Sequence, residues 1–329
     1  MKKLLFSLIS LSLGIILLFW LVQKIGWRNI KDTILQLSFW ELIFVLFLGF
    51  LCLLFGTLRW REILRQKGYQ FSIAELYGEY LASFAITYLV PLVFFGNEVF
   101  RSQVLNLKRK DSLLPEKTLS AAIIDRIFET GFQITTIFLG VLSLFLITGS
   151  LLMSFVVIVF LFFLILLFYY FFFFKKSFIG GFLRLDKNNH FRLIEKEIFA
   201  FFKIRNRFFQ RALLFSFLKT TLNLLQYWIL IYFLGSKLSF LEAVSVLGIS
   251  ILSMAPPISA DFGSHDWGSA LLCSKLGLGM ERGVAFASIV RGINLILATL
   301  GILFLIKIGF FAFLQKILKK INKLLSIKR

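Results

Sequence analysis

Residues 151–174 read LLMSFVVIVFLFFLILLFYYFFFF, which is 24 consecutive positions without a charged side chain. About 20 apolar residues are enough for a helix to cross a hydrocarbon core of roughly 30 Å. The backbone of such a run must satisfy its own hydrogen bonds inside lipid, so we expect it to be helical. Of the 329 residues in the chain, 59% are hydrophobic and 16% are charged, whereas a soluble domain is typically about a quarter charged. The composition therefore excludes a soluble or secreted domain and predicts an all-α polytopic membrane protein.

Similar apolar runs predict about six full spans within a single transmembrane domain that comprises residues 1–329. Residues 4–22 lack a small-residue cleavage site, so we expect them to form an uncleaved first span and not a signal peptide. Residues 175–211 carry ten Lys or Arg interleaved with phenylalanines, a pattern that fits either interfacial helices or a solvated basic loop. Residues 312–329 form a basic tail. The expected spans are 4–22, 39–57, 118–148, 151–174, 212–234 and 284–311.

The positive charges of the chain are concentrated between these runs. The formal net charge is +20, and 27 of the 37 Lys and Arg lie in five segments. Cytoplasmic loops of membrane proteins are enriched in Lys and Arg, so we expect these segments and both termini to be cytoplasmic. Residues 73–117 and 235–282 must then enter and leave the membrane on one side, as re-entrant hairpins. The five basic segments are 1–3, 58–72, 99–117, 175–211 and 312–329.

The two predicted hairpins share a repeated pattern of turn residues and charges. The interval from Pro91 to Arg126 is 35 residues, and so is the interval from Pro256 to Arg291. Proline ends a helix and glycine permits a tight reversal, so each hairpin would place a helix N-terminus inside the membrane. The halves 1–150 and 151–311 would form an inverted repeat with a substrate site at the midplane, as in many transporters. The alternative is that these segments are ordinary loops between full spans. The predicted hairpin-turn residues are Pro91, Gly96, Pro256, Pro257 and Gly263.

Ionisable residues inside the predicted spans and hairpins form the candidate substrate-binding site. Such residues are costly in a membrane and usually face a cavity or an ionic partner. The arginines suit an anionic group, most naturally a lipid phosphate. The acids would balance them, recognise a cationic headgroup or carry a coupling proton, while the alternative is a set of ion pairs that hold the hairpins in place. The candidates are Arg101, Arg126 and Arg291 with Glu98, Asp125, Glu129 and Asp266.

Motifs for cofactor chemistry are missing from the sequence. Cys52 and Cys273 lie in apolar surroundings without C-x-x-C spacing, and no metal-ligand cluster or nucleotide-binding glycine motif is present. We therefore expect no catalytic residue, metal or cofactor. Because the basic residues follow the membrane topology, we also expect no nucleic-acid partner.

Several motifs in this order resemble the transmembrane region of the lysylphosphatidylglycerol synthases, a family of flippase-like membrane proteins. A basic R-W-R motif follows the second span, and a P-x-x-x-x-G-E-x-x-R-type element ends in Glu98 and Arg101, with Asn97 inserted before the acid. An E-R-x-x-D-type element reads Asp125-Arg126-Ile127-Phe128-Glu129 with its acids exchanged. A late P-x-x-G-G-x-G-x-x-E-type segment departs from the pattern, because Ala260-Asp261 replace the double glycine and His265-Asp266 replace an arginine–glutamate pair.

The resemblance implies movement of a phospholipid or lipid-linked headgroup between leaflets of a bacterial cytoplasmic (inner) membrane. Its expected partners are a membrane lipid with an anionic phosphate headgroup and a separately encoded lipid-modifying enzyme. Two other functions stay open at this point. One is a membrane enzyme on a lipid-linked substrate, similar to a polytopic glycosyltransferase, and the other is an accessory subunit of a separate synthase.

Overall fold

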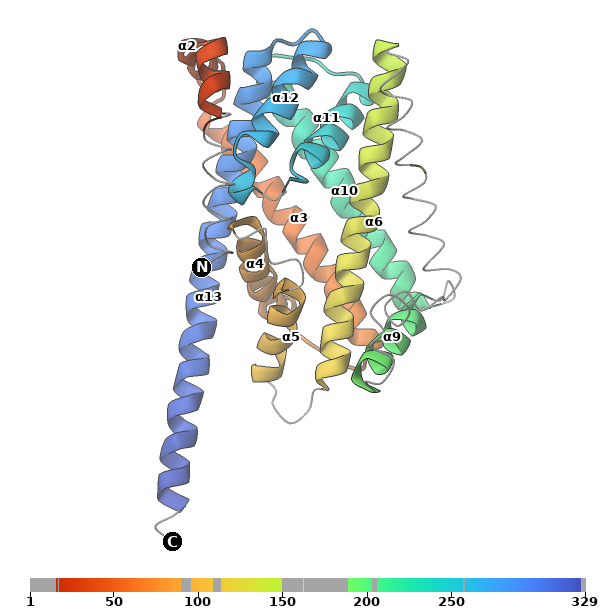
Figure 1. Ribbon diagram of the computed structural model, residues 1–329, viewed down its shortest axis with the longest axis vertical. Helices are drawn as coiled ribbons and strands as arrows, with labels where there is room; N and C mark the ends of the chain where they lie inside the picture. Colours follow the sequence, from red (N-terminus) through yellow and green to blue (C-terminus); the bar gives the residue numbers. More distant parts are fainter. Residues whose placement is uncertain are drawn as a thin grey trace.

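The computed structural model describes residues 16, 18–89, 96–108, 114–149, 162, 189–202, 206–256 and 258–326. Every regular element in this part of the chain is a helix. This confirms the prediction of an all-α architecture. Figure 1 shows the helices gathered into one elongated bundle.

Four helices are long and apolar enough to cross a membrane, and they correspond to four of the expected spans. Each exceeds the roughly 20 residues that a crossing needs. The expected spans 4–22 and 151–174 lie largely outside the described residues. The four helices are α3 (Phe39–Gln66), α6 (Pro115–Thr148), α10 (Arg207–Phe233) and the Met280–Gly309 part of α13 (Met280–Ser326).

Helix α3 is longer than the apolar run that predicts it. The run ends at Thr57, but the helix continues to Gln66. Arg59, which we expected to follow the span in a basic cytoplasmic segment, therefore lies inside the helix and its side chain is 1% exposed. The helix therefore extends nine residues beyond the expected span, and Arg59 is buried because the carboxylates that accept its hydrogen bonds come from another helix.

Residues 73–117 contain the first hairpin, which consists of α4 (Ile73–Leu89) and α5 (Gly96–Lys108). At 1.5 Å per residue these helices are about 26 and 20 Å long, so neither spans a 30 Å core. Both lie in the lower half of the bundle in Figure 1. Gly96 begins α5 as expected, and Pro91 lies outside the described residues.

Residues 235–282 contain the second hairpin, formed by α11 (Phe240–Ser253) and α12 (Ser264–Lys275) with the short 3₁₀ turn η1 (Ser259–Asp261) between them. These helices occupy the upper half of the bundle (Figure 1). Pro256 lies in the connection and is exposed, while Pro257 lies outside the described residues.

The two hairpins contact each other near the end of α4 and at η1, which we call their tips. The Tyr88 hydroxyl near the end of α4 donates a hydrogen bond of 3.3 Å to the Ala260 carbonyl in η1. Since α4 and α5 come from the lower half and α11 and α12 from the upper half, the hairpins enter from opposite ends of the bundle. This is the arrangement that an inverted repeat requires.

Small residues let the helices of the hairpins approach the long helices closely. A Cβ atom on Gly140 of α6 would lie 2.6 Å from the Cα atom of Gly248 on α11. Gly301 of α13 faces the Leu81 carbonyl of α4 in the same way. Helix association inside a membrane relies on such close backbone packing, because lipid supplies no hydrophobic driving force between helices.

The basic segment 175–211 contains helix α9 (Asn189–Phe201) and the first turn of α10. Residues 175–188 and 203–205 of this segment lie outside the described part. The end of α9 is attached to α6, since Phe202 stacks on Phe128 with 5.6 Å between ring centroids. The Lys67 ammonium just beyond α3 lies 2.6 Å from the Glu197 carboxylate. Burial lowers the pKa of Lys67, and the interaction with Glu197 opposes that shift. Residues 189–201 are therefore helical, the aromatic residues at the end of this helix pack on the protein, and its place at the membrane interface stays a prediction.

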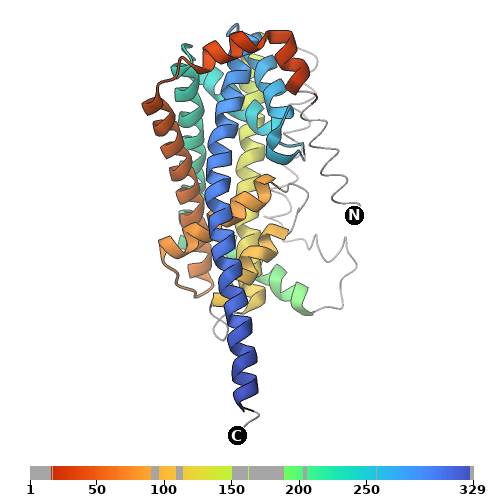
Figure 2. The same ribbon diagram turned by 90° about the vertical axis from the view of Figure 1, so that its left-hand side faces the viewer.

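The described parts of four segments that we expected to be cytoplasmic gather at one end of the molecule. The end of α3, the end of α5 with the start of α6, helix α9 and the end of α13 all lie at the bottom of Figure 1. In Figure 2, α13 extends past the other helices at this end. The shared end agrees with the charge distribution, and the assignment of that end to the cytoplasm stays a prediction.

Candidate functional site

A cavity of about 290 Å³ opens between the long helices and the first hairpin. Helices α3, α5, α6 and α10 supply its charged side chains, α4 adds uncharged ones, and α11 and α13 complete the wall. Charged side chains from four different helices gather at one part of this cavity. They are Arg59, Glu98, Arg101, Asp125, Arg126, Glu129 and Lys219.

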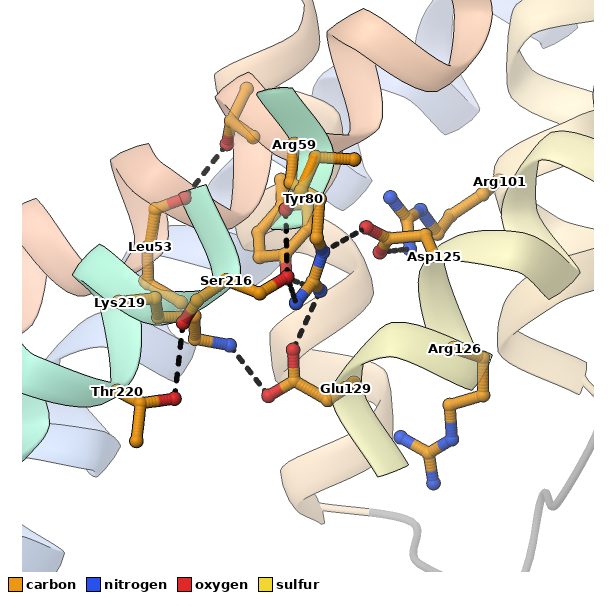
Figure 3. Close-up of polar contacts among 12 residues, drawn as sticks. Leu53, Arg59, Tyr80, Arg101, Asp125, Arg126, Glu129, Ser216, Lys219 and Thr220 are labelled. Carbon is orange, nitrogen blue, oxygen red and sulfur yellow. Dashed lines mark hydrogen bonds and ion pairs between the residues drawn. The ribbon is translucent and has the colours of Figure 1, made fainter. Parts of the chain in front are cut away.

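Arg59 is at the centre of the charged part (Figure 3). Its Nε atom lies 2.6 Å from Oδ1 of Asp125, and its Nη2 atom lies 2.6 Å from Oε2 of Glu129. The Tyr80 hydroxyl accepts a longer hydrogen bond of 3.4 Å from the same guanidinium. Asp125 and Glu129 are four residues apart on α6, so both carboxylates project from one face of that helix toward Arg59.

Each of the two acids uses its second oxygen to hold another cation. Oδ2 of Asp125 accepts a hydrogen bond of 2.7 Å from Arg101 of α5, and Oε1 of Glu129 accepts one of 2.6 Å from Lys219 of α10. The Arg101 guanidinium also lies over the Trp60 ring, 3.8 Å from its centroid. The network therefore ties the first hairpin to α3, α6 and α10 by charge-assisted hydrogen bonds and a cation–π contact.

Arg126 differs from the other cations of the cavity because much of it faces open space. Its side chain is 43% exposed, and in the described part of the chain its ion pair is with Glu98 at 3.8 Å. Figure 3 shows its guanidinium directed away from the network around Arg59. With four cations and three carboxylates, the charged part of the cavity has a formal charge of +1. The arrangement can therefore accept an anion, with Arg126 as the accessible donor.

Asp266 and Arg291 lie apart from this cavity and pair with each other. Asp266 of α12 accepts a hydrogen bond from Arg291 of α13, and both side chains are buried. The backbone N–H of Gly263 donates a second hydrogen bond of 3.0 Å to the same carboxylate, and the guanidinium lies over the Phe262 ring. Our expectation that Arg291 needs an acid from another segment is confirmed.

The seven predicted site residues thus divide into two groups. Glu98, Arg101, Asp125, Arg126 and Glu129 line one cavity, whereas Asp266 and Arg291 form a separate pair in the second hairpin. Their role in binding a substrate stays a prediction for both groups. Among the described residues, no group of three or more His, Cys, Asp or Glu is arranged to hold a metal ion.

Comparison with known protein families gives one match. A model described as "Lysylphosphatidylglycerol synthase TM region" matches residues 7–302. The chain belongs to this family. A comparison with proteins of curated function finds no match.

Ala260 and Asp261, which stand in place of the double glycine of the resembled pattern, both have positive φ angles. Their φ angles of 53° and 54° lie in the left-handed region that glycine occupies without strain. An L-residue with a Cβ atom pays roughly 1–2 kcal/mol for this conformation. The turn at the tip of the second hairpin therefore keeps a backbone conformation suited to glycine, despite the two substitutions.

Sequence reasoning missed three residues that complete the charged part of the cavity. Arg59 belongs to the R-W-R motif, but we assigned it to the basic cytoplasmic segment 58–72 and not to the site. Lys219 is a lysine inside the span expected at 212–234, a signal that could have nominated it as a site residue. Tyr80 carries no sequence signal of its own, because its role depends on the position of Arg59 across the helix interface.

Proposed function

We propose that this protein moves a phospholipid or another lipid-linked headgroup between the two leaflets of a membrane. Membership in the lysylphosphatidylglycerol synthase TM family places it among membrane proteins related to lipid modification or transport. The headgroup would enter the cavity while the hydrophobic tails remain in the bilayer. The membrane would be a bacterial cytoplasmic membrane with both termini of the chain in the cytoplasm.

The observation that carries this proposal is the accessible guanidinium of Arg126 within a cavity that holds a net positive charge. A guanidinium matches phosphate oxygens in a bidentate geometry. A phosphate that enters this site would replace the long contact between Arg126 and Glu98 without breaking the shorter pairs around Arg59. A lipid phosphate can therefore bind while the bundle keeps its internal ion pairs.

The opposed hairpins supply the second part of the proposed mechanism. Transporters with inverted repeats open a central site alternately to each side by moving one structural unit against another. In this protein the two tips meet at the hydrogen bond from Tyr88 to Ala260. Separation of the tips would extend the cavity toward the upper end of the bundle.

The test is translocation of fluorescent phospholipids by the purified chain in proteoliposomes, read as the fraction that an added membrane-impermeant quencher can reach. Arg126→Ala should reduce the rate at least about tenfold, because the phosphate loses its charged partner. The matched control is Arg28→Ala, which removes an arginine whose side chain is 93% exposed outside the cavity. Melting curves should be unchanged in both variants. Full transport by the folded Arg126→Ala variant would refute the phosphate site.

A further inference from the structure

The wall of the cavity changes from charged to uncharged polar along the bundle. On α6, Gln133 and Thr136 follow Glu129, and on α10, Asn223 follows Lys219. Helices α6 and α10 run in the same direction from the end that carries α9 (Figure 1). At 1.5 Å per residue, four of the uncharged groups lie roughly 6–10 Å beyond Glu129 or Lys219, and Thr220 lies about 1.5 Å beyond Lys219. We call them the amide layer: Gln133, Thr136, Thr220, Asn223 and Gln226.

The amide layer presents both donors and acceptors to the cavity. The hydroxyls of Thr136 and Thr220 donate to carbonyls of their own helices at 2.7 and 3.0 Å, which leaves their oxygens as acceptors. Gln226 donates from its amide to the Val45 carbonyl at 3.0 Å and keeps its side-chain oxygen. Within the described part of the chain, the amides of Gln133 and Asn223 line the cavity without a hydrogen bond to another residue.

Carboxylates are confined to the charged part of the cavity. Asp125 and Glu129 are each held between two cations at 2.6–2.7 Å. Glu98 is different, because one of its oxygens is buried without a hydrogen-bond partner in the described residues. A headgroup that reached past the phosphate would therefore meet amides and hydroxyls. The amide layer contains no carboxylate that could neutralise an ammonium group.

We infer that the transported lipid carries an uncharged headgroup rich in hydroxyls, a sugar or another polyol, attached to its phosphate. This inference rests on the proposed function and names the substrate class of the same cavity. Each hydroxyl both donates and accepts, which matches the side-chain amides of Asn and Gln. Aromatic rings of Phe84, Phe132 and Tyr227 also line the cavity and offer flat surfaces to the apolar face of a sugar ring.

The dimensions of the cavity agree with this class of ligand. Its volume is about 290 Å³, at the lower end of the roughly 300–1,000 Å³ of ordinary ligand pockets. Such a cavity accommodates a single headgroup and excludes the hydrophobic tails. The two layers together therefore recognise a phosphate at one level and hydroxyls at the next.

The experiment compares three fluorescent lipids in the same proteoliposomes: phosphatidylinositol, phosphatidylethanolamine and phosphatidic acid. They present a phosphate with a neutral polyol, with a cation and with no further group. Phosphatidylinositol should cross at least about fivefold faster than phosphatidylethanolamine, as expected for two or more hydrogen bonds of typical strength. Asn223→Leu and Gln133→Leu should remove this preference by slowing phosphatidylinositol to about the rate of phosphatidylethanolamine. Gln103→Leu is the matched control, because Gln103 is an exposed amide on α5 that does not line the cavity.

A further variant, Asn223→Asp, tests the same inference without the loss of a polar side chain from the cavity. Asn223→Asp preserves the size of the side chain and adds a carboxylate to the amide layer, so it should shift the preference toward phosphatidylethanolamine. Equal rates for the three lipids, or a faster rate for phosphatidylethanolamine in the wild type, would overturn the inference and leave the proposed function standing. Transport of none of them above empty liposomes would overturn both.

Discussion

Replacing Asp125 with asparagine removes the carboxylate that joins α3, α5 and α6. Arg59 and Arg101 contact its two oxygens at 2.6 and 2.7 Å, and the Asp125 side chain is 3% exposed. After the substitution both guanidinium groups stay buried. Arg59 keeps its ion pair with Glu129, whereas Arg101 loses the carboxylate that it contacts. Removal of one partner from a buried ion pair typically costs about 3–5 kcal/mol, because the other charge stays buried without compensation.

This cost translates into a large change in thermal stability. One kcal/mol corresponds to about 2–4 °C in Tm for a chain of a few hundred residues. We therefore expect Asp125→Asn to lower the Tm of the purified protein by on the order of 10 °C, measured by intrinsic fluorescence in detergent. The double variant Asp125→Asn/Arg101→Gln should recover a substantial part of the loss, because it removes one of the two uncompensated cations.

The control for this prediction is an exposed ion pair of the same type. Asp32 pairs with Arg28 at 3.9 Å, and its side chain is 63% exposed. Pairs in contact with solvent contribute little to stability, so Asp32→Asn should leave the Tm unchanged. A Tm of Asp125→Asn close to that of the wild type, with no recovery in the double variant, would refute the view that this carboxylate holds the hairpin in place.

Three further predictions concern the packing and placement of the hairpins. Gly140→Leu should abolish the monodisperse peak in size-exclusion chromatography, since its Cβ atom would lie 2.6 Å from the Gly248 Cα atom and overpacking typically costs 1–3 kcal/mol or more. Ala260→Gly should raise the Tm by a few degrees, because glycine removes about 1 kcal/mol of strain at a φ of 53°. In a background without native cysteines, Leu114→Cys and Lys275→Cys should react with a membrane-impermeant thiol reagent from opposite sides of intact cells. Leu114 precedes α6 and Lys275 ends α12, and Figure 1 shows these helix ends at opposite ends of the bundle.

Each of these predictions has a contrasting measurement. Gly309→Leu should be tolerated, as a Cβ atom there has no neighbour within 4 Å. Ala243→Gly lies inside α11 and should lower the Tm, because glycine destabilises a helix interior. Labelling of both cysteine variants from one side would contradict opposed hairpins. Equal behaviour of the two alanine-to-glycine variants would contradict strain in the turn.

Local properties of the sequence determined the class of protein and much of its architecture. Long uncharged runs require helices in lipid wherever they occur, so four of the expected spans in the described residues are helices of the predicted kind. Turn residues and the distribution of basic side chains indicated the two hairpins, because the positions of both are set by short-range chemistry and membrane topology. The shared face of Asp125 and Glu129 follows from helical periodicity alone.

Tertiary structure alone decided which charges meet. Arg59 pairs with an aspartate 66 residues away, and Glu129 pairs with a lysine 90 residues away. The spacing within one helix says on which face a charge lies, but the packing of helices decides which other face it meets. For this reason the sequence could nominate seven ionisable residues without dividing them between the cavity and the separate Asp266–Arg291 pair. For the same reason the sequence placed Arg59 only in a basic segment. Its carboxylate partners, Asp125 and Glu129, lie 66 and 70 residues further along the chain.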